Sequence, residues 1–378
     1  MDDPIRQGYY NFAIDPTDPS RLYFAVYGKG VYVSNDGAGS QMPLFGKSNE
    51  MRGKLVTAVV VDPTDSDTIY VGSEEGVFIT SDRGDTWSTF NSSLDTGQAR
   101  TLAMTADGTL LCGTLGYELY YYDILDNGWR QLASLGNFGT LWPIWDDRPL
   151  YHYTSLLVDP TDNQTVYMGS FPAGVYKTTD GGKTWRERNV GWTNDGVFSL
   201  VFHPEDIDII YAGTYNGVNR STNGGEHWEM WDNGWPPEQW VFSIVFDPRD
   251  PDVMYACSKN GEEMGRGREG FHGTVMKSVD GGATWFEITN GLNVVQEFYK
   301  LIVDPVSLDT LYLATQGDGV FISHDGGARW APWNEGLTNL MAATNGNNVT
   351  NVLALSADDD VLYFGTMGSG VWRRGLEH

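Results

Sequence analysis

One unit recurs along this chain, and its recurrence constrains the fold more than any other property of the sequence. The fullest copy, Val59 to Phe90, reads VVVDPTDSDTIYVGSEEGVFITSDRGDTWSTF. It contains four short runs of strand-forming residues, named strands A to D, which are joined by turn-forming residues. Such units must stack side by side, because a single unit is too small to bury its own apolar face.

Local chemistry identifies each strand of the unit. Strand A is an apolar run that ends at Asp-Pro, where proline stops strand pairing and the following polar residues turn the chain. Strand B is TIYVGS, and strand C is GVFITS, in which alternating apolar residues direct one face inward. Strand D begins at the tryptophan of DRGDTW. The unit is therefore expected to form one small sheet.

The period of the unit predicts the architecture. Its strand B aromatics are Tyr23, Tyr70, Tyr167, Tyr211, Tyr255, Tyr312 and Tyr363, and the weaker segment LLCGT around Leu111 fills the gap. Repeats of roughly 40 to 57 residues with four strands each are typical of propeller blades. We therefore expect an all-β fold, a single β-propeller of four-stranded antiparallel blades, with eight blades. Seven blades are the alternative, in which the weak third copy is something else.

The ends of the repeat predict how the ring closes. The last copy stops at Trp372 to Gly375 without a strand D of its own. Because an unpaired sheet edge is a liability, we expect the N-terminal segment to supply the missing outer strand. The propeller domain then spans residues 1–375, and residues 376–378 (Leu-Glu-His) read as the remnant of an expression tag.

The turn between strands C and D repeats the pattern S/T-x-D/N-x-G-x-x-W in five copies. Within this turn, the Asp or Asn oxygen accepts backbone N–H bonds and the glycine takes a positive φ. The tryptophan is expected to cover the outer strands of its blade. Degenerate versions occur at Ser34-Asp36 and Asp126-Gly128-Trp129. The predicted structural residues are Asp82, Trp87, Asp180, Trp185, Asn223, Trp228, Asp280, Trp285, Asp325 and Trp330.

This motif resembles the Asp-box, or BNR repeat, of sialidase-like propellers. Proteins that look similar include sialidases, xyloglucan-active endoglucanases, sortilin-type receptors and photosystem II assembly factors. The resemblance covers nearly the whole chain and implies boxes that lie far from any active site. Because one fold hosts many functions, the resemblance does not choose among them.

Loop lengths predict which face of the propeller carries function. In a blade, the A-to-B and C-to-D turns lie on one face, while the B-to-C turns and D-to-A connections lie on the other. The first set is nearly uniform, whereas the long segments all belong to the second: residues 137–152, 231–240, 259–273 and 331–349. Long irregular loops on a rigid scaffold usually carry binding residues. We expect the functional site on this insertion-bearing face.

The insertions supply aromatic and polar side chains that suit sugar rings or the side chains of a protein partner. Trp333 belongs to the insertion at 331–349, and Trp192 and Tyr299 are further aromatics on shorter connections. Tryptophan also packs between blades, so both roles remain open for each ring. The expected ligand-binding residues are Trp142, Trp145, Arg148, Tyr151, His152, Trp235, Trp240, Arg266, Arg268 and His272.

Four acids of the same insertions are weaker, catalytic candidates: Asp146, Asp147, Glu262 and Glu263. A paired-carboxylate glycosidase needs two acids roughly 5 to 9.5 Å apart, one of them with a raised pKa. The sequence does not give that distance, and adjacent loop acids are usually solvated. A sialidase is disfavoured because no FRIP-like arginine segment is present. The second propeller and the Asp-Val-Gly-Gly-like segment of xyloglucan-active enzymes are also missing from these residues.

Cofactor chemistry has no support in the sequence. The histidines are scattered, with no H-x-x-x-H or Cys/His cluster, so we expect no metal site. The box turns lack the alternating acids and distal glutamate of a calcium loop, and GRGREG at 265–270 lacks the Lys-Ser/Thr of a phosphate loop. We expect no cofactor. Cys112 and Cys257 lie in apolar runs, so we expect two buried free thiols.

Charge limits the range of partners. The 50 acidic and 24 basic residues give a formal net charge of −26, which repels nucleic acid and anionic lipid surfaces. No run approaches the roughly 20 apolar residues of a membrane span. The N-terminus lacks the basic and apolar regions of a signal peptide, and the tag remnant is consistent with removal of one. We expect a monomeric protein that is secreted or periplasmic.

Two hypotheses of different classes follow. The first is a non-catalytic binding or scaffolding propeller whose insertion-bearing face binds a glycan or a protein partner. The alternative is a glycoside hydrolase, or another polysaccharide-acting enzyme, with carboxylates on the same face. A third class, an assembly factor for a membrane complex, predicts co-purification with a protein partner, and Arg148, Arg266 and Arg268 are its one indication.

Overall fold

The computed structural model describes residues 9–26, 28–37, 40–94, 98–104, 109–114, 118–123, 127–134, 155–162, 164–170, 174–181, 184–192, 196–260, 273–292, 297–315, 318–334, 350–355, 361–366 and 370–376. These residues form eight antiparallel sheets, seven of four strands and one of three, and each sheet is numbered by its order in the chain.

The first sheet is β1 (Tyr9–Asp15), β2 (Asp18–Val26), β3 (Gly30–Ser34) and β4 (Met42–Pro43); the second is β5 (Val56–Val61), β6 (Ile69–Ser73), β7 (Gly76–Thr80) and β8 (Ser88–Thr89). The third is β9 (Ala99–Met104), β10 (Leu110–Thr114), β11 (Glu118–Asp123) and β12 (Gly128–Ser134); the fourth is β13 (Ser155–Val158), β14 (Val166–Ser170), β15 (Gly174–Thr178) and β16 (Arg186–Glu187). The fifth is β17 (Val197–His203), β18 (Asp206–Thr214), β19 (Gly217–Ser221) and β20 (Glu229–Met230); the sixth is β21 (Gln239–Asp247), β22 (Asp250–Asn260), β23 (Val275–Ser278) and β24 (Phe286–Glu287). The seventh is β25 (Phe298–Val303), β26 (Leu311–Thr315), β27 (Val320–Ser323) and β28 (Ala331–Pro332); the eighth is β29 (Thr350–Leu355), β30 (Val361–Thr366) and β31 (Gly370–Gly375).

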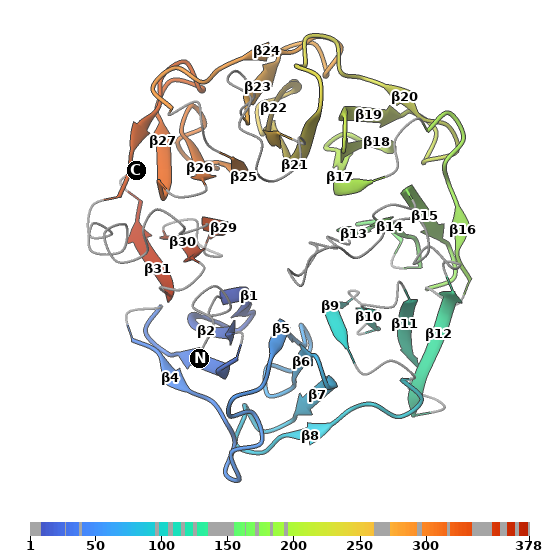
Figure 1. Cartoon of the computed structure of the whole chain (residues 1–378), viewed down its shortest axis with the longest axis vertical. Coiled ribbons are helices and arrows are strands. Elements are labelled where there is room, and N and C mark those ends of the chain that lie inside the picture. Colours follow the sequence, from blue (N-terminus) through green and yellow to red (C-terminus); the bar gives the residue numbers. More distant parts are fainter. Residues whose placement is uncertain are drawn as a thin grey trace.

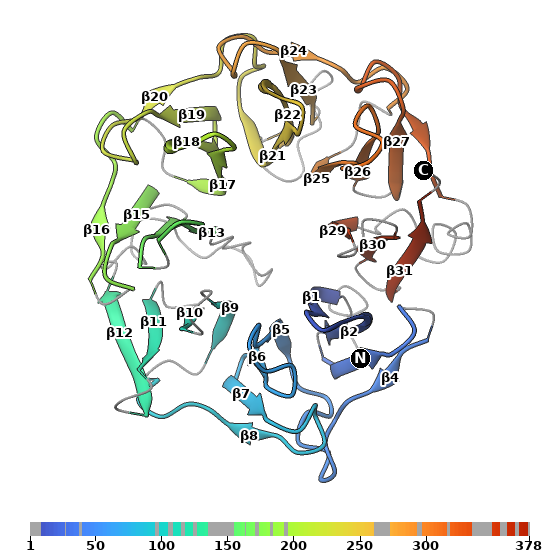
Figure 2. The ribbon, with the colours of Figure 1, turned by 180° about the vertical axis from the view of Figure 1, so that it is seen from behind.

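The sheets stand around a common centre in chain order (Figure 1). The first strand of each sheet lies nearest the centre, and the view from behind shows the same ring (Figure 2). β1 contacts β30, so the first and last sheets are neighbours. The all-β, propeller arrangement expected from the repeat is therefore confirmed. The closing strand was assigned to the N-terminal segment, and residues 1–8 lie outside the described residues, so ring closure and blade count stay predictions.

The weak third copy of the repeat also forms a four-stranded sheet. In this sheet, Leu111 of β10 pairs with Ala103 of β9 and with Tyr121 of β11. Its last strand, β12, has seven residues, whereas the last strands of the other four-stranded sheets have two. The weak sequence signal thus accompanies a longer last strand and not a missing sheet.

The box turns are braced by hydrogen bonds around their Asp or Asn. Thr86 donates to Asp82 through its hydroxyl (2.6 Å) and its backbone N–H (2.8 Å), and the Thr80 hydroxyl adds a third bond (2.7 Å). The bonds from Thr86, followed by that from Thr80, lower the pKa of Asp82 to about 2. The degenerate first copy keeps the same brace, because Ser40 N and Ser34 Oγ both donate to Asp36 Oδ1 at 2.8 Å.

Box tryptophans of the fifth, sixth and seventh sheets join neighbouring sheets through their indole N–H groups. Trp228 Nε1 of the fifth sheet donates to Arg188 O of the fourth (2.8 Å), and Trp330 Nε1 of the seventh donates to Ile288 O of the sixth (2.7 Å). Gly291 fits against this second contact, because a Cβ there would lie 2.2 Å from Trp330 O, and its φ is +94°. The tryptophans were expected to cover their own outer strands; their indole bonds add a direct link between blades.

Apolar clusters fill the space between neighbouring sheets. One cluster combines Tyr23 of the first sheet with Val59 and Trp87, which belong to the second. Another combines Tyr255 of the sixth sheet with Leu301 of the seventh. The core of the molecule is therefore a series of layers between sheets.

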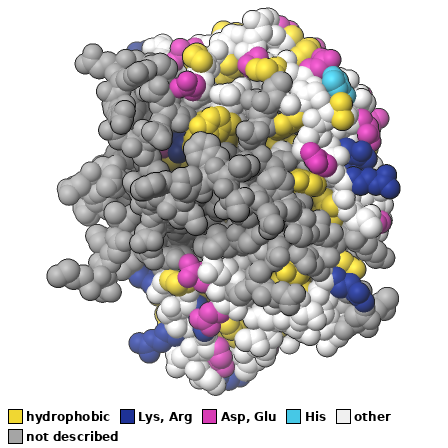
Figure 3. Space-filling model, turned by 45° about the vertical axis from the view of Figure 1, so that its right-hand side comes forward, with side chains coloured by type: hydrophobic (Ala, Val, Ile, Leu, Met, Phe, Trp, Pro, Cys, Tyr) yellow, Lys and Arg dark blue, Asp and Glu magenta, His cyan; other side chains and the backbone are white. Residues whose placement is uncertain are grey.

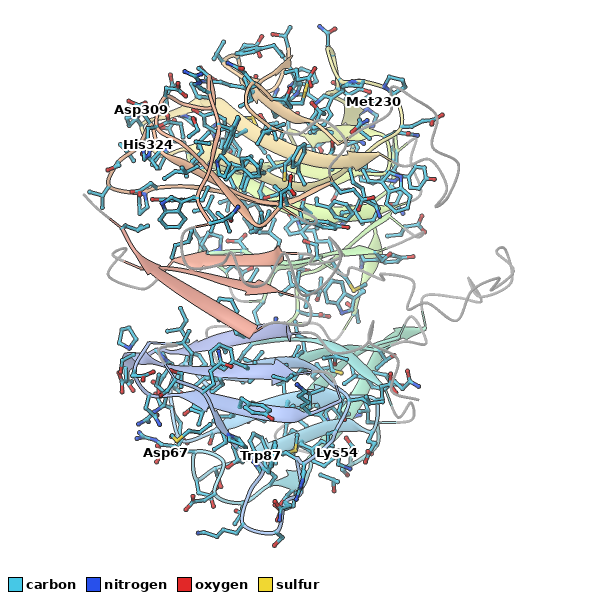
Figure 4. The ribbon with its side chains drawn as sticks, turned by 60° about the vertical axis from the view of Figure 1, so that its left-hand side comes forward. Lys54, Asp67, Trp87, Met230, Asp309 and His324 are labelled. Carbon is cyan, nitrogen blue, oxygen red and sulfur yellow. The ribbon has the colours of Figure 1, made fainter. Side chains whose placement is uncertain are left out.

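Short turns and D-to-A connections lie on opposite faces of the disc. Asp67 and Asp309, in A-to-B turns, lie at one face together with His324, whereas Lys54, in the connection before β5, lies at the other (Figure 4). The side of Lys54 is the insertion-bearing face, and the opposite side is called the box face.

Cys112 and Cys257 are buried free thiols, as expected. No helix in the described part of the chain is long and apolar enough to cross a membrane. Within the same residues, no group of three or more His, Cys, Asp or Glu side chains is arranged to hold a metal ion.

Candidate functional site

The sixth sheet reaches further toward the insertion-bearing face than the other described sheets. In the fifth sheet, the ladder between the first two strands begins at Val197↔Thr214 and is followed at once by a bulge. In the sixth sheet, the pair before the bulge is Val241↔Ser258. The ladder continues past this pair toward the insertion-bearing face with Trp240↔Lys259 and Gln239↔Asn260. At about 3.4 Å per residue, this extension projects roughly 7 Å beyond the level at which its neighbour begins.

A buried polar network holds the base of the extension. Ser258 Oγ donates to Gln239 Oε1 (2.6 Å) and accepts a hydrogen bond from Thr274 N (3.1 Å). Ser258 N donates in turn to Thr274 O (2.9 Å), directly before β23. All three residues are buried. Because buried polar groups are costly without partners, this network fixes the two strands that residues 261–272 connect.

Bulges in three consecutive inner strands present a row of aromatic rings. The ladder skips one residue near the start of β17, β21 and β25, and the skipped residues are Phe198, Phe242 and Tyr299. The ring centroids of Phe198 and Phe242 are 4.9 Å apart, and those of Phe242 and Tyr299 are 5.2 Å apart. A bulge re-aims the side chain of the inserted residue. The ladder skips one residue near the start of β1, β5, β9 and β29 as well, so the run of aromatic residues at the bulge, and not the bulge itself, distinguishes these three neighbouring sheets.

Trp240 joins this row from the extension. Its ring stacks on Phe198, with centroids 5.4 Å apart and planes 14° apart, and Tyr215 lies 4.7 Å away. Trp240 is half-buried, and its Nε1 is buried without a hydrogen-bond partner among the described residues. The Trp240 indole thus forms one end of the aromatic row and is held there by Phe198, which covers part of one face of its ring.

One cation and one anion lie against these rings. Lys259 Nζ lies 4.6 Å from the Trp240 centroid and 5.8 Å from the Phe242 centroid, and the lysine side chain is 14% exposed. Desolvation lowers the pKa of Lys259, and Glu297, whose Oε2 is 3.9 Å from Nζ, opposes that shift. Glu297 is 33% exposed, and its Oε2 accepts a hydrogen bond from Tyr299 OH (2.6 Å). We name the whole set the rim cluster: Phe198, Tyr215, Trp240, Phe242, Lys259, Glu297 and Tyr299.

The rim cluster offers binding chemistry. It combines partly exposed aromatic surface with an ammonium donor and a carboxylate acceptor, the mixture that fixes and orients a bound ligand. Across the described residues visible in Figure 3, acidic, basic and hydrophobic side chains are interspersed.

Raised carboxylic acid pKa values mark candidate general acids. Among them, Asp232 is the one carboxylic acid whose pKa is raised, and burial is the cause. Asp232 lies in the turn after β20, four residues after the box tryptophan, where other copies have Asn91, Asn189 and Asn334. Each of these asparagines accepts a backbone N–H bond from strand C through Oδ1. The raised pKa thus belongs to a repeated turn position.

The two predicted tryptophans of residues 231–240 have different surroundings. Trp240 belongs to the rim cluster. Trp235 lies 5.7 Å from Trp285 in an edge-to-face contact, and it occupies the turn position that Leu94 and Leu292 fill in other copies. The ligand-binding role of both stays a prediction.

The remaining predicted site residues lie outside the described residues. They come from residues 135–154 and 261–272. The ligand-binding members are Trp142, Trp145, Arg148, Tyr151, His152, Arg266, Arg268 and His272, and the catalytic candidates are Asp146, Asp147, Glu262 and Glu263.

The sequence analysis does not identify most of the rim cluster, although one signal for it exists. When the copies are aligned at the bulge of the inner strand, the bulge residue is Phe198, Phe242 and Tyr299 in three successive copies. It is Tyr10 in the first copy, Thr57 in the second, Arg100 in the third and Asn351 in the eighth. A local run of aromatics at one repeat position would therefore have indicated these sheets.

Comparison with known proteins yields one curated relative, and no family model matches the chain. Over 218 residues, the chain is 24% identical to a probable oligoxyloglucan-reducing end-specific xyloglucanase of Neosartorya fischeri, a match that covers 54% of this chain and 20% of that protein. The chain thus spans about a fifth of the length of the curated relative it matches.

Solved structures share the fold. A GH74 xyloglucanase from Xanthomonas campestris has a TM-score of 0.57 and 18% identity, covering 99% of this chain and 52% of its own. Sqt1 from Chaetomium thermophilum has a TM-score of 0.65 and 11% identity, covering 98% and 97%. YCF48 bound to D1 peptide has a TM-score of 0.54 and 13% identity, covering 100% and 96%. These likenesses show that the chain shares the β-propeller fold.

Proposed function

We propose that this chain is a non-catalytic binding propeller whose insertion-bearing face binds a glycan or a protein partner. The extended ladder of the sixth sheet carries the proposal, because it raises Trp240 and Lys259 beyond the level at which the neighbouring ladder begins. The proposal includes an exported, monomeric protein with Asp-box repeats and eight blades over residues 1–375, closed by the N-terminal segment.

Three observations support binding as the role of this face. The extension stands on a buried hydrogen-bond network, so its side chains are held in position before a ligand arrives. The aromatic row draws on three consecutive sheets, which gives a wider contact than one loop. YCF48 bound to D1 peptide and the xyloglucanase from Xanthomonas campestris supply a protein and a glycan precedent on the same fold.

A glycoside hydrolase is the second candidate function. The match over 218 residues to a probable xyloglucanase favours it. In that case Asp146, Asp147, Glu262 or Glu263 would supply the acid and the base or nucleophile from the insertions of the same face.

A screen that measures binding and hydrolysis together tests the proposal. We expect the full chain to bind glycans on an array, or to capture a protein partner, without releasing reducing ends from xyloglucan or other polysaccharides. Binding should weaken in Trp142→Ala, Trp145→Ala and Trp240→Ala. Hydrolysis that is lost in Asp146→Asn, Asp147→Asn, Glu262→Gln or Glu263→Gln would overturn the non-catalytic assignment.

A further inference from the structure

We infer that the rim cluster recognises an uncharged sugar ring through two neighbouring hydroxyl groups, one accepting a hydrogen bond from Lys259 and the other donating to Glu297. The inference rests on the proposed function, because it names the ligand class of the proposed binding face. The residues that would make this contact are Lys259 of the sixth sheet and Glu297, next to the seventh. The catalytic candidates Asp146, Asp147, Glu262 and Glu263 have no part in it.

The charges of the cluster favour an uncharged ligand. Lys259 and Glu297 present one positive and one negative group 3.9 Å apart, so a ligand that touches one group also meets the field of the other. A ligand carboxylate would gain from Lys259 and be repelled by Glu297, and a ligand ammonium would meet the opposite pair of effects. A hydroxyl group both donates and accepts, so adjacent hydroxyls satisfy both groups without a net charge.

The hydrogen-bonding state of Lys259 favours a polar ligand over an apolar side chain. Among the described residues, the Lys259 ammonium makes no hydrogen bond, because Glu297 is beyond bonding distance and the other contacts are ring faces. Covering this group with an apolar side chain would leave its donors without partners in a water-poor site, which is costly. A hydroxylated ring supplies the missing acceptor.

The aromatic row favours a ring with an apolar face. Phe242 and Tyr299 are half-buried neighbours of the charged pair, and their ring planes are 31° apart. Such surfaces receive the C–H face of a sugar while its hydroxyls point to polar groups at the edge. Trp240 is braced against Phe198, so the row keeps its shape when the ligand leaves.

Calorimetric titration with tetrasaccharides of three charge types tests the inference. The probes are cellotetraose, mannotetraose and xylotetraose as neutral chains, tetragalacturonic acid as the acidic chain and the chitosan tetramer as the basic chain. We expect at least one neutral probe to bind at least about tenfold more tightly than both charged probes. Lys259→Met and Glu297→Gln should each weaken that binding about tenfold or more, since the first removes the ammonium donor and the second replaces a charged acceptor by a weaker neutral one.

Lys277→Met is the matched control. Lys277 Nζ also lies over a ring of the sixth sheet, 5.0 Å from the Tyr255 centroid, but it donates to Gly326 O in the box turn of the seventh sheet. This variant should bind the neutral probe like the parent chain. Circular dichroism and thermal unfolding of all three variants separate lost contacts from lost folding.

Four outcomes would overturn the inference. Tightest binding of tetragalacturonic acid, strengthened by Glu297→Gln, would make the cluster an anion site. Tightest binding of the chitosan tetramer, strengthened by Lys259→Met, would make it a cation site. Capture of a protein partner that Trp240→Ala abolishes, with no tetrasaccharide bound, would reject the sugar and leave the proposed function standing. If neither sugar nor protein binding depends on this face, both fail.

Discussion

The box face and the insertion-bearing face use the same repeat in opposite ways. On the box face, Asp82, Asp280 and Asp325 make equivalent turn bonds in three different sheets. On the other face, the bulge near the start of the inner strand recurs in most sheets, but its residue varies: Thr57 in the second copy, and Phe198, Phe242 and Tyr299 in three neighbouring sheets. The extended ladder belongs to the sixth sheet. The comparison teaches that the repeated contacts hold the ring together, whereas the proposed binding face lies where the copies differ.

Two tryptophans express this difference in single side chains. Trp228 is 1% exposed, and its indole N–H is bonded to the neighbouring sheet. Trp240 is half-buried, and its indole N–H has no partner among the described residues. The hydrogen-bonding capacity of the Trp228 indole is thus met within the fold. Trp240, a member of the rim cluster, has an indole N–H that bonds to no described residue.

Truncation of these two tryptophans should give the largest contrast. Trp228→Ala removes a fully packed ring and the bond to Arg188 O, so we expect a loss of about 3 to 5 kcal/mol in the free energy of unfolding. Trp240→Ala should lower the free energy of unfolding by less than half as much as Trp228→Ala does. It should weaken ligand binding more than Trp228→Ala does. Urea unfolding and calorimetric binding measure the two effects. Equal losses of stability would remove the distinction between the faces.

Removal of the Ser258 hydroxyl should give the next largest effect. Ser258→Ala leaves Gln239 Oε1 and Thr274 N without this partner, at a cost of about 1 to 3 kcal/mol. The loss should be local, so amide hydrogen exchange should rise at residues 239, 258 and 274 while box-turn amides stay protected. Uniformly faster exchange in every sheet would show that the extension is not an independent unit.

The stability of the protein at acid pH should depend on the carboxylates of the box turns. Hydrogen bonds from Thr86 lower the pKa of Asp82 from 3.8 to about 2. A depressed folded pKa stabilises the protein above the unfolded pKa, and this contribution is lost as pH falls from about 4 to about 2. Asp82→Asn should therefore flatten the acid limb of the stability profile. At neutral pH the change should be small, because Asn223 already fills this position in the fifth sheet. An unchanged acid limb would contradict the assignment.

Substitution of the rim lysine should have the smallest effect on stability. Lys259→Met keeps the stem that lies along Trp240 and removes an ammonium whose burial is costly. We expect the free energy of unfolding to stay within about 0.5 kcal/mol of the parent or to rise slightly. Urea unfolding checks this value. A loss comparable to that of Trp228→Ala would make Lys259 a structural residue.

The repeated scaffold was accessible from the sequence because its signals are local. The brace of Asp82 involves Thr80 and Thr86, which are two and four residues away, so spacing alone predicts the contacts. The same logic identified the strands, the turns and the two faces. The copy at Ser34-Asp36 reads as degenerate in sequence, because Gln41 stands where other copies have tryptophan. Its turn nevertheless keeps the hydrogen bonds to Asp36.

The binding surface depended on tertiary structure because its members come from different sheets. Trp235 and Trp240 belong to one insertion and are equivalent by sequence criteria. The fold sets Trp235 against Trp285, fifty residues along the chain, and sets Trp240 between Phe198 and Lys259. Local spacing determined that this chain forms sheets arranged around an axis. Which ring each tryptophan packs against was decided by the neighbouring sheets, since these contacts join residues that no short stretch of sequence contains.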